Sequence, residues 1–346
     1  MFQFGVIGGG SWATALVKIL TDNKIPVSWW VRSDAIVQHI QARHHNPNYL
    51  SSVYFDTSLL RLSASITDVV AQSDCVVIAI PSAYVTDALK DLPADAFNNK
   101  QIISAVKGIL PEQNQLLNDY LQQQFGFPLN DYFTVMGPCH AEEVAAEKLS
   151  YLTFSGSDEQ RAAGIAEHFN TYYLSTVVNH DVYGVQYAAV LKNIYAVGAG
   201  IAHGLEYGDN FLSVLIANCA DEMAGFLRHA GIRNMEVGIH QEADPVSHKK
   251  AANYAASVYL GDLLVTCYSP YSRNRSFGNM IGKGYSVRTA QLEMNMVAEG
   301  YNASKCIHLI NKEIKAELPI AGTVYNILWE HLSPRKGFKY IEENLV

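Results

Sequence analysis

Three consecutive glycines directly behind a short apolar run most constrain how this chain can fold. Residues Gln3–Ile7 have the composition of a buried strand, and the segment Gly8–Ala13 (GGGSWA) follows at once. The next residues, Trp12–Thr21, carry apolar side chains at helical spacing. A strand, a glycine turn and a helix in this order predict the first unit of a doubly wound α/β sheet.

The segment Gly8–Ala13 also fits the pattern G-x-G-x-x-G/A, in the strand-to-helix context that this pattern requires. Gly8 permits the tight turn, Gly10 lets the backbone approach a pyrophosphate, and Ala13 lets the helix pack close to the strand. The N-terminus of the helix then faces the anion. We therefore predict that this loop binds the pyrophosphate of a dinucleotide.

Strand-like and helix-like segments alternate through the first half of the chain. Several runs are apolar throughout, such as Cys75–Ile80, which is typical of parallel strands buried on both faces. The other candidate strands are Val27–Val31, Gln101–Ala105, Phe133–Met136 and, toward the sheet edge, Tyr151–Phe154 and Ser175–Val178; candidate helices between them are Ala35–Ala42, Ala83–Leu92 and Glu112–Gln124. This alternation predicts a mostly parallel sheet covered by helices.

Helical periodicity dominates after about Gly184 and continues to the C-terminus. We therefore predict an α/β Rossmann-type N-terminal domain with a mostly parallel sheet over residues 1–183, followed by an all-helical, substrate-binding and catalytic C-terminal domain over residues 184–346. The length of 346 residues accommodates two such domains. In a chain of this kind we expect the active site in the cleft between the domains.

Composition argues against several classes of protein. A net charge of −8 and a pI near 5.8 are not those of a nucleic-acid-binding protein. The five scattered cysteines contain no C-x-x-C pair, which predicts reduced thiols rather than a disulfide framework or a metal site. The N-terminus lacks a signal-peptide pattern, and the most apolar stretch, Tyr187–Ala202, is short for a membrane span and contains Lys192. We expect a cytoplasmic protein without a membrane span, and a homodimer stays open.

The residues after the second predicted strand bear on the choice of nicotinamide cofactor. Arg32 follows this strand, and an arginine there can hold the 2′-phosphate of NADP. Asp34 comes two residues later, and an acidic side chain near this point can bind the ribose 2′-hydroxyl of NAD. The sequence therefore favours NADP through Arg32 and leaves NAD open. The simpler alternative is an arginine on the surface.

Two lysines have the placement that carbonyl reduction needs. Lys107 follows a predicted parallel strand, at the sheet edge where ligands bind, although a solvated loop lysine is the simpler interpretation. Lys192 lies in a largely apolar helix, and a buried lysine needs a partner or a function. A lysine whose pKa is lowered by burial or by a nearby like charge can donate a proton to a carbonyl oxygen. We predict this role for Lys192, with Lys107 supplying the like charge.

Two later segments carry groups suited to a phosphorylated substrate. Asp262 and Thr266 share a face if their segment is helical, and Asp262 could then orient Lys192 and balance its charge. Ser272, Arg273 and Asn274 place a hydroxyl, a guanidinium and an amide in sequence, a set suited to phosphate oxygens. A basic surface loop is the alternative for this second segment.

Together these motifs resemble the bacterial NAD(P)-dependent glycerol-3-phosphate dehydrogenases, over nearly the whole length and in the family's order. The segments that carry the resemblance are Gly8–Ala15 (GGGSWATA), Asn46–Leu50 (NPNYL), Val106–Gly108 (VKG), Gly137–Val144 (GPCHAEEV), Leu191–Asn193 (LKN), Gly204–Asn210 (GLEYGDN), Gly261–Cys267 (GDLLVTC), Ser272–Gly278 (SRNRSFG) and Val297–Gly300 (VAEG). The resemblance implies reversible reduction of dihydroxyacetone phosphate to sn-glycerol 3-phosphate with NADPH or NADH, which supplies the backbone of membrane phospholipids.

The resemblance also implies a role for each matching residue. Lys192 would be the catalytic proton donor and acceptor, assisted by Lys107 and Asp262. The residues that would bind the small phosphorylated three-carbon substrate are Lys107, Gly137, Cys139, Lys192, Asp262, Thr266, Ser272, Arg273 and Asn274. Those that would bind the cofactor are Gly8, Gly10, Ser11, Trp12, Arg32, Lys107, Ala141, Arg273, Val297 and Glu299.

The chain departs from the family pattern in three places. Cys139 stands where the family usually has Ser or Thr, and a thiol is a weaker hydrogen-bond partner. Tyr259-Leu260 stands where the family commonly has Gly, just before Gly261. The stretch Arg233–Ala255 is longer and more polar than the usual connection.

Two alternative functions stay open on the sequence alone. Another dehydrogenase of this build, such as a β-hydroxyacid dehydrogenase or a ketopantoate reductase, also places a lysine on an interdomain helix. The segments around Asp262 and Arg273 favour the phosphorylated substrate over those. A non-catalytic NADP-binding sensor would keep the glycine loop but would not need Lys107, Lys192 and Asp262 together.

Overall fold

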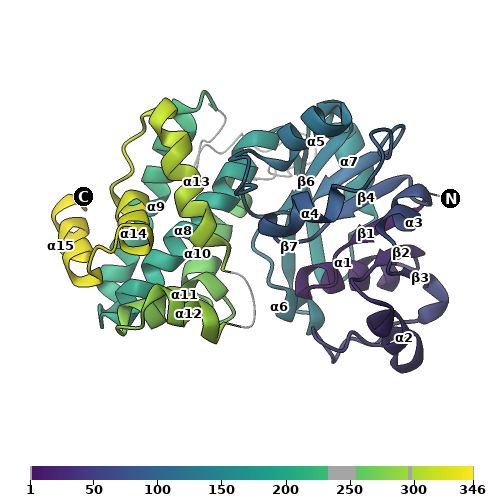
Figure 1. The fold of residues 1–346 in the computed structure, drawn as a ribbon, viewed down its shortest axis with the longest axis horizontal. Coiled ribbons are helices and arrows are strands. Elements are labelled where there is room, and N and C mark those ends of the chain that lie inside the picture. Colours follow the sequence, from purple (N-terminus) through teal and green to yellow (C-terminus); the bar gives the residue numbers. More distant parts are fainter. Residues whose placement is uncertain (1, 233–254, 295–297, 346) are drawn as a thin grey trace, which may run out of the picture. The chain divides into compact units, whose positions relative to one another are not determined.

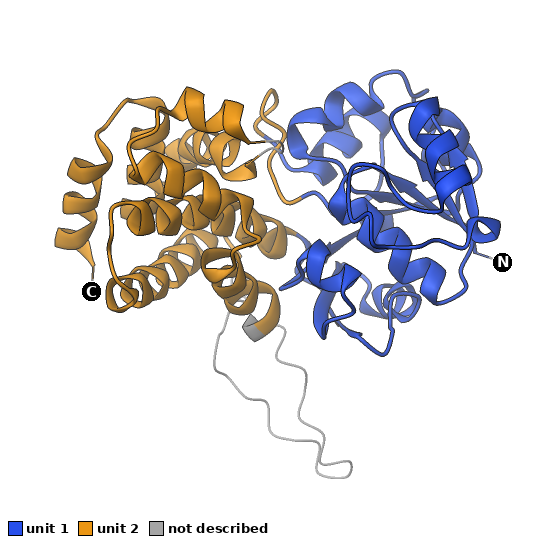
Figure 2. Cartoon of the chain, turned by 90° about the horizontal axis from the view of Figure 1, so that it is seen from below, with its two compact units in different colours: residues 1–106, 115–182 blue, residues 107–114, 183–346 orange. Residues whose placement is uncertain are grey.

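The computed structural model describes residues 2–232, 255–294 and 298–345. By its internal contacts the chain forms two compact units, one of residues 1–106 and 115–182 and the other of residues 107–114 and 183–346 (Figure 2). Residues 107–114 thus belong to the second unit, although they follow a strand of the first. The predicted domain boundary after residue 183 stays a prediction.

The first unit is built on a sheet with the strand order β3-β2-β1-β4-β5-β6-β7-β8 (Figure 1). Neighbouring strands are parallel except β6 and β7, so the predicted mostly parallel sheet is confirmed. The strands are β1 Phe4–Ile7, β2 Val27–Trp30, β3 Leu60–Ser63, β4 Cys75–Ile78, β5 Gln101–Ser104, β6 Tyr132–Met136, β7 Ser150–Gly156 and β8 Leu174–Asn179.

Helices connect these strands and pack against the sheet. They are α1 Ser11–Asp22, α2 Asp34–Arg43, α3 Ile66–Ala71, α4 Val85–Leu89, α5 Leu117–Phe125, α6 Ala141–Ala145 and α7 Glu159–Glu167. Helix α1 is buried along most of its length, with Leu16, Val17 and Leu20 fully shielded from solvent. This burial fixes the position of the residues that begin α1.

Several predicted elements differ from the observed ones. Strand β3 was not predicted, because its four residues LRLS are short and only partly buried. The predicted helix Glu112–Gln124 is wrong in its first turn, since α5 begins at Leu117. The predicted helix Ala83–Leu92 is shorter in the structure, where a 3-10 turn at Ser82–Tyr84 precedes α4.

From α8 onward the described part of the second unit is helical, as predicted, whereas residues 107–114 form no helix. Its helices are α8 Val182–Gly204, α9 Asp209–His229, α10 Asp262–Tyr268, α11 Arg273–Gly282, α12 Val287–Glu293, α13 Glu299–Ile314, α14 Pro319–Trp329 and α15 Pro334–Asn344, and the π-helix Ala255–Gly261 leads into α10. Helices α8 and α11 are in backbone contact, because a Cβ at Gly200 would collide with the carbonyl oxygen of Arg275 and one at Gly278 with that of Val197. This contact holds the start of α11 close to the middle of α8.

Candidate active site

The glycine loop of the first unit joins β1 to α1. Gly8 has a φ of +142°, and a Cβ there would collide with the carbonyl oxygen of Ala79. Gly10 precedes Ser11, the first residue of α1, and a Cβ at Gly10 would meet no described atom within 4 Å. The backbone is therefore open directly at a helix N-terminus. This arrangement fits the pyrophosphate of a dinucleotide.

Arg32 and Asp34 follow β2, and both are exposed. Asp34 is the first residue of α2, and Arg32 lies in the short connection before it. Because both side chains reach the surface beside the end of a parallel strand, each is accessible to a ligand there.

The turn between β6 and α6 contains three predicted site residues. Gly137 has a φ of +126°, and a Cβ there would lie 2.9 Å from the carbonyl oxygen of Tyr151 on β7. Cys139 is 6% exposed, and Ala141 is the first residue of α6. The antiparallel neighbour β7 therefore packs so closely that a larger residue at position 137 would be strained.

Lys192 is buried in the second unit, where it is paired with Asp262. Its Nζ lies 2.5 Å from Oδ1 of Asp262, and the two side chains are 4% and 2% exposed. Lys192 lies within α8, and Asp262 is the first residue of α10. Oγ1 of Thr266 donates a hydrogen bond to the carbonyl oxygen of Asp262 at 2.6 Å. The segment is helical, so Asp262 and Thr266 share a face as predicted.

Burial lowers the pKa of Lys192 to about 8, from its usual value of 10.5. The negative charge of Asp262 opposes this change, and the positive charge of Lys107 lowers the pKa further. An ammonium group with such a pKa can release and regain a proton near neutral pH, as a general acid must.

The second carboxylate oxygen of Asp262, Oδ2, is available to a ligand. Oδ2 is buried and has no hydrogen-bond partner among the described residues, whereas Oδ1 contacts Lys192. Buried carboxylate oxygens are normally hydrogen-bonded. Oδ2 can therefore accept a hydrogen bond from a hydroxyl group of a ligand.

A chain of three hydrogen bonds, made through the side-chain amides of Asn193 and Asn274, links four segments of the second unit. Nδ2 of Asn193 donates to the carbonyl oxygen of Lys107, and Nδ2 of Asn274 donates to Oδ1 of Asn193, both at 2.8 Å. The backbone N–H of Gly300 donates to Oδ1 of Asn274 at 2.9 Å. The chain fixes the backbone at Lys107 against α8 and the start of α11. Sequence reasoning assigned no role to Asn193, although it lies beside Lys192 in the segment Leu191–Asn193 that carries the resemblance.

The remaining predicted residues of this unit lie at the beginnings of helices. Oγ of Ser272 accepts the backbone N–H of Arg275 at 3.3 Å and so caps α11. Arg273 is the first residue of α11, and Glu299 is the first residue of α13; both are half-buried. Val297 lies outside the described residues.

The predicted site residues divide between the two units. The first unit contains Gly8, Gly10, Ser11, Trp12, Arg32, Gly137, Cys139 and Ala141, and the second contains Lys107, Lys192, Asp262, Thr266, Ser272, Arg273, Asn274 and Glu299. Within the second unit Lys192 contacts Asp262 directly, and the positive charge of Lys107 also acts on Lys192.

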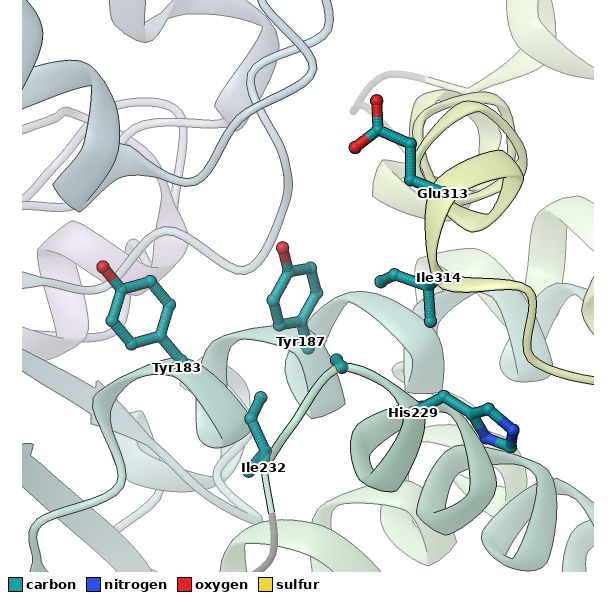
Figure 3. Close-up of a pocket in the computed structure, with 7 residues that line it drawn as sticks. Tyr183, Tyr187, His229, Ile232, Glu313 and Ile314 are labelled. Carbon is teal, nitrogen blue, oxygen red and sulfur yellow. The ribbon is translucent and has the colours of Figure 1, made fainter.

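A separate open pocket of about 510 Å³ lies in the second unit (Figure 3). Its lining comes from α8, the end of α13, and the end of α9 with the residues just after it. The lining residues are Tyr183, Tyr187, His229, Ala230, Ile232, Glu313 and Ile314. These are not the predicted site residues, so the pocket does not bear on the assignment above.

The described residues include no helix with the length and hydrophobicity of a membrane span. They also contain no group of three or more His, Cys, Asp or Glu side chains that could hold a metal ion.

Solved structures share this fold over nearly the whole chain. A crystal structure of glycerol-3-phosphate dehydrogenase from Coxiella burnetii matches with a TM-score of 0.86 and 24% identity, covering 99% of both chains. The enzyme of the same name from Plasmodium falciparum matches with a TM-score of 0.79 and 20% identity, covering 100% of this chain and 96% of the other. At these identities the likeness establishes the fold.

Sequence comparison identifies the family. A Bacillus anthracis protein named glycerol-3-phosphate dehydrogenase (NAD(P)+) is 30% identical over 330 residues, which is 95% of this chain and 92% of the relative. Residues 3–162 match the family model described as the NAD-dependent glycerol-3-phosphate dehydrogenase N-terminus, and residues 181–339 match the model for the C-terminus. The chain therefore belongs to the NAD-dependent glycerol-3-phosphate dehydrogenase family.

Proposed function

We propose that this protein catalyses the reversible NAD(P)H-dependent reduction of dihydroxyacetone phosphate to sn-glycerol 3-phosphate, and so feeds glycerophospholipid synthesis. The observation that carries the proposal is the buried Lys192–Asp262 pair, whose 2.5 Å contact and lowered lysine pKa suit proton transfer to a carbonyl oxygen. Membership of the family supports this choice of substrate.

In the reduction, the ammonium of Lys192 donates a proton to the substrate oxygen as negative charge develops on it, and in the reverse reaction the neutral amine takes that proton back. A nicotinamide cofactor, when bound, would supply or accept the hydride. The positive charge of Lys107 stabilises the developing alkoxide. Asp262 holds the ammonium of Lys192 through Oδ1, while its Oδ2 accepts a hydrogen bond from a substrate hydroxyl.

The substrate phosphate binds at the start of α11. Arg273 can contact two phosphate oxygens at once, and the positive end of a helix dipole favours an anion at the same point. Ser272 and Asn274 flank this guanidinium, and Gly137, Cys139 and Thr266 complete the substrate contacts in this proposal. Asn193 acts as a positioning residue, because it holds the backbone of Lys107.

The cofactor binds at the glycine loop of the first unit. Gly8, Gly10, Ser11 and Trp12 receive the pyrophosphate, and Arg32 favours NADPH by pairing with the 2′-phosphate, while Asp34 permits NADH. The further cofactor contacts in this proposal are Lys107, Ala141, Arg273, Val297 and Glu299.

Initial rates with dihydroxyacetone phosphate, measured with NADPH and with NADH, test the proposal directly. We expect turnover with both cofactors and a lower KM for NADPH. Ketopantoate serves as the control substrate, and we expect no turnover of it. Oxidation of NADPH by ketopantoate but not by dihydroxyacetone phosphate would overturn the proposal.

The phosphate assignment has its own test. Arg273→Ala should raise the KM for dihydroxyacetone phosphate about 100-fold, because a charge-assisted bidentate contact is lost. The matched control is Arg288→Ala, since Arg288 is an exposed arginine of α12. An unchanged KM in the Arg273 variant would contradict the assignment.

We further propose that the enzyme works in the cytoplasm as a homodimer. The five cysteines are free and buried, as in proteins of a reducing compartment, and two-fold dimers are the commonest soluble assembly. Light scattering of the purified protein checks the assembly, and a monomeric mass would refute the dimer.

A further inference from the structure

We propose that Thr14, Trp29 and Asn46 are positioning residues for the cofactor, because together they hold all three carbonyl groups of the glycine loop away from the bound pyrophosphate. The inference rests on the proposed function, in which a dinucleotide binds at this loop. None of these three side chains was among the predicted site residues.

Each carbonyl oxygen of Gly8-Gly9-Gly10 accepts a hydrogen bond from a different side chain. Nε1 of Trp29 donates to Gly8 at 2.7 Å, Nδ2 of Asn46 donates to Gly9 at 3.1 Å, and Oγ1 of Thr14 donates to Gly10 at 2.9 Å. The donors come from β2, from the segment after α2 and from α1. Thr14 and Trp29 are fully buried, and Asn46 is 1% exposed.

Asn46 uses its whole amide group in this arrangement. Its Nδ2 donates to the carbonyl oxygen of Gly9 and, at 2.9 Å, to Oγ1 of Thr14. Its Oδ1 accepts the backbone N–H groups of Asn48 and Tyr49 at 3.0 and 3.3 Å. The hydrogen bond that Oγ1 of Thr14 receives orients the hydroxyl toward Gly10, so the donors at Gly9 and Gly10 form one connected network.

Because the peptide bond is planar, the three contacts to the carbonyl groups also set the orientation of the backbone N–H groups that follow them. In a trans peptide the C=O of one residue and the N–H of the next point in opposite directions. Fixing the carbonyls of Gly8, Gly9 and Gly10 therefore fixes the N–H groups of Gly9, Gly10 and Ser11, and aims them away from the three donor side chains. Among the described residues nothing lies within 4 Å of a Cβ built at Gly10, so the loop is open at this point.

The same contacts act on the electrostatics of the loop. A carbonyl oxygen facing the pyrophosphate would repel it, whereas N–H groups and the helix N-terminus attract it. Backbone N–H groups already hold the two ends of the loop, since Gly8 donates to Trp30 and Thr14 donates to Gly10. Without the side-chain contacts the loop would still be conformationally freer, and ordering it on binding would weaken affinity. The three donors keep the carbonyl oxygens turned away from the pyrophosphate, and they order the loop before the cofactor binds.

A purely structural role predicts a different result from a positioning role. If the three side chains only satisfied buried polar groups, removing one would lower the thermal midpoint and leave cofactor affinity unchanged. If they position the loop, removing one weakens cofactor binding specifically, with little effect on kcat at saturating cofactor or on the KM for the carbonyl substrate.

The test uses the full-length enzyme and three variants with matched shapes. Thr14→Val removes the hydroxyl and keeps the branched side chain, and Thr14→Ser restores the hydroxyl. Thr134→Val is the control, because Thr134 is fully buried in β6 and its hydroxyl has no partner among the described residues. The dissociation constant of NADPH is measured by fluorescence titration without the second substrate, at a temperature well below every thermal midpoint.

We expect Thr14→Val to raise the dissociation constant about tenfold, as loss of one buried hydrogen bond would, with Thr14→Ser and Thr134→Val close to the wild type. If Thr14→Val failed to fold, Trp29→Phe would replace it, since it keeps a buried aromatic ring and removes the indole donor to Gly8. A Thr14→Val enzyme that binds NADPH as tightly as the wild type, or no more weakly than the Thr134→Val enzyme, would overturn the inference alone. A wild type that binds neither NADPH nor NADH would overturn the proposed function and this inference with it.

Discussion

Two lysines, one in each unit, are buried but differ in the charge and the solvent exposure of the groups around them. Nζ of Lys18 on α1 lies 2.6 Å from Oδ2 of Asp22 and 3.0 Å from Oε1 of Glu147, and these carboxylate side chains are 38% and 43% exposed. The hydroxyl of Tyr173 lies 3.5 Å from the same Nζ. Two carboxylates therefore lie beside the single positive charge of Lys18, and both are partly exposed to solvent.

Lys192 has less negative charge around it. Its paired carboxylate, Asp262, is 2% exposed, and the positive charge of Lys107 acts on it as well. Burial in a helix alone therefore does not identify a catalytic lysine. What separates the two is the balance of charge and water around the ammonium, which leaves Lys192 with a pKa of about 8.

The largest expected effect is on turnover. Lys192→Ala should lower kcat by about 10³–10⁴-fold, because general acid catalysis is lost, with the NADPH dissociation constant nearly unchanged. Lys18→Ala is the matched control and should leave kcat nearly unchanged. Steady-state rates of both variants check this. Equal losses in the two would break the distinction between the lysines.

Replacing each of the two lysines should also change the free energy of unfolding by a different amount. Lys192→Met leaves Asp262 buried and unpaired, and should lower the free energy of unfolding at pH 7 by about 3 kcal/mol. Lys18→Met should lower it by only about 1 kcal/mol, because Asp22 and Glu147 can be solvated. Urea unfolding measures both values. Adding Asp262→Leu to Lys192→Met should recover most of the loss, and failure to do so would show that the buried charge was not its cause.

The pH dependence of the rate sharpens the comparison further. In the proposed mechanism the protonated form of Lys192 is active in the reducing direction, so kcat/KM should be constant below pH 8 and fall about tenfold per pH unit above it. In the oxidising direction the neutral amine is active, so the rate should rise with pH and level off above about pH 8. Lys107→Met removes a like charge and should shift the pH dependence of the rate to higher pH in both directions of the reaction. An unchanged pH dependence would show that Lys107 does not act on Lys192.

The smallest effect is expected at a partner of Lys18. Asp22→Asn leaves the pair between Lys18 and Glu147 intact, so the free energy of unfolding should change by only about 0.5 kcal/mol and kcat should not change. The corresponding variant of the second unit, Asp262→Asn, should lower kcat, because Lys192 loses the group that orients it. A loss of turnover in Asp22→Asn would link Lys18 to the chemistry.

Features encoded in neighbouring residues were predictable from the sequence. The glycine loop follows β1 and begins α1 at Ser11, and both the strand and the helix have distinctive local patterns. Lys192 was identified because its helix is otherwise apolar. By the same criterion Lys18 on the apolar helix α1 is a candidate as well, and the sequence does not separate the two lysines, because the second carboxylate at Lys18, Glu147, is 129 residues away.

Contacts between distant segments set the limit of such reasoning. Asn193 binds the carbonyl of Lys107, and Asn46 binds that of Gly9, but nothing in the spacing of these residues reveals either pairing. The direction of β7 was likewise not predicted, because its sequence SYLTFSG mixes polar and apolar residues and lacks the continuous apolar run that indicates a parallel strand.

The excursion of residues 107–114 into the second unit has a consequence for exchanging parts between related enzymes. The chain passes from one unit to the other after residues 106, 114 and 182. A chimera joined at residue 183 would therefore combine Lys107 from one parent with Asn193 and Asp262 from the other. A chimera that keeps each unit intact must therefore take residues 107–114 and the C-terminal half from the same parent enzyme.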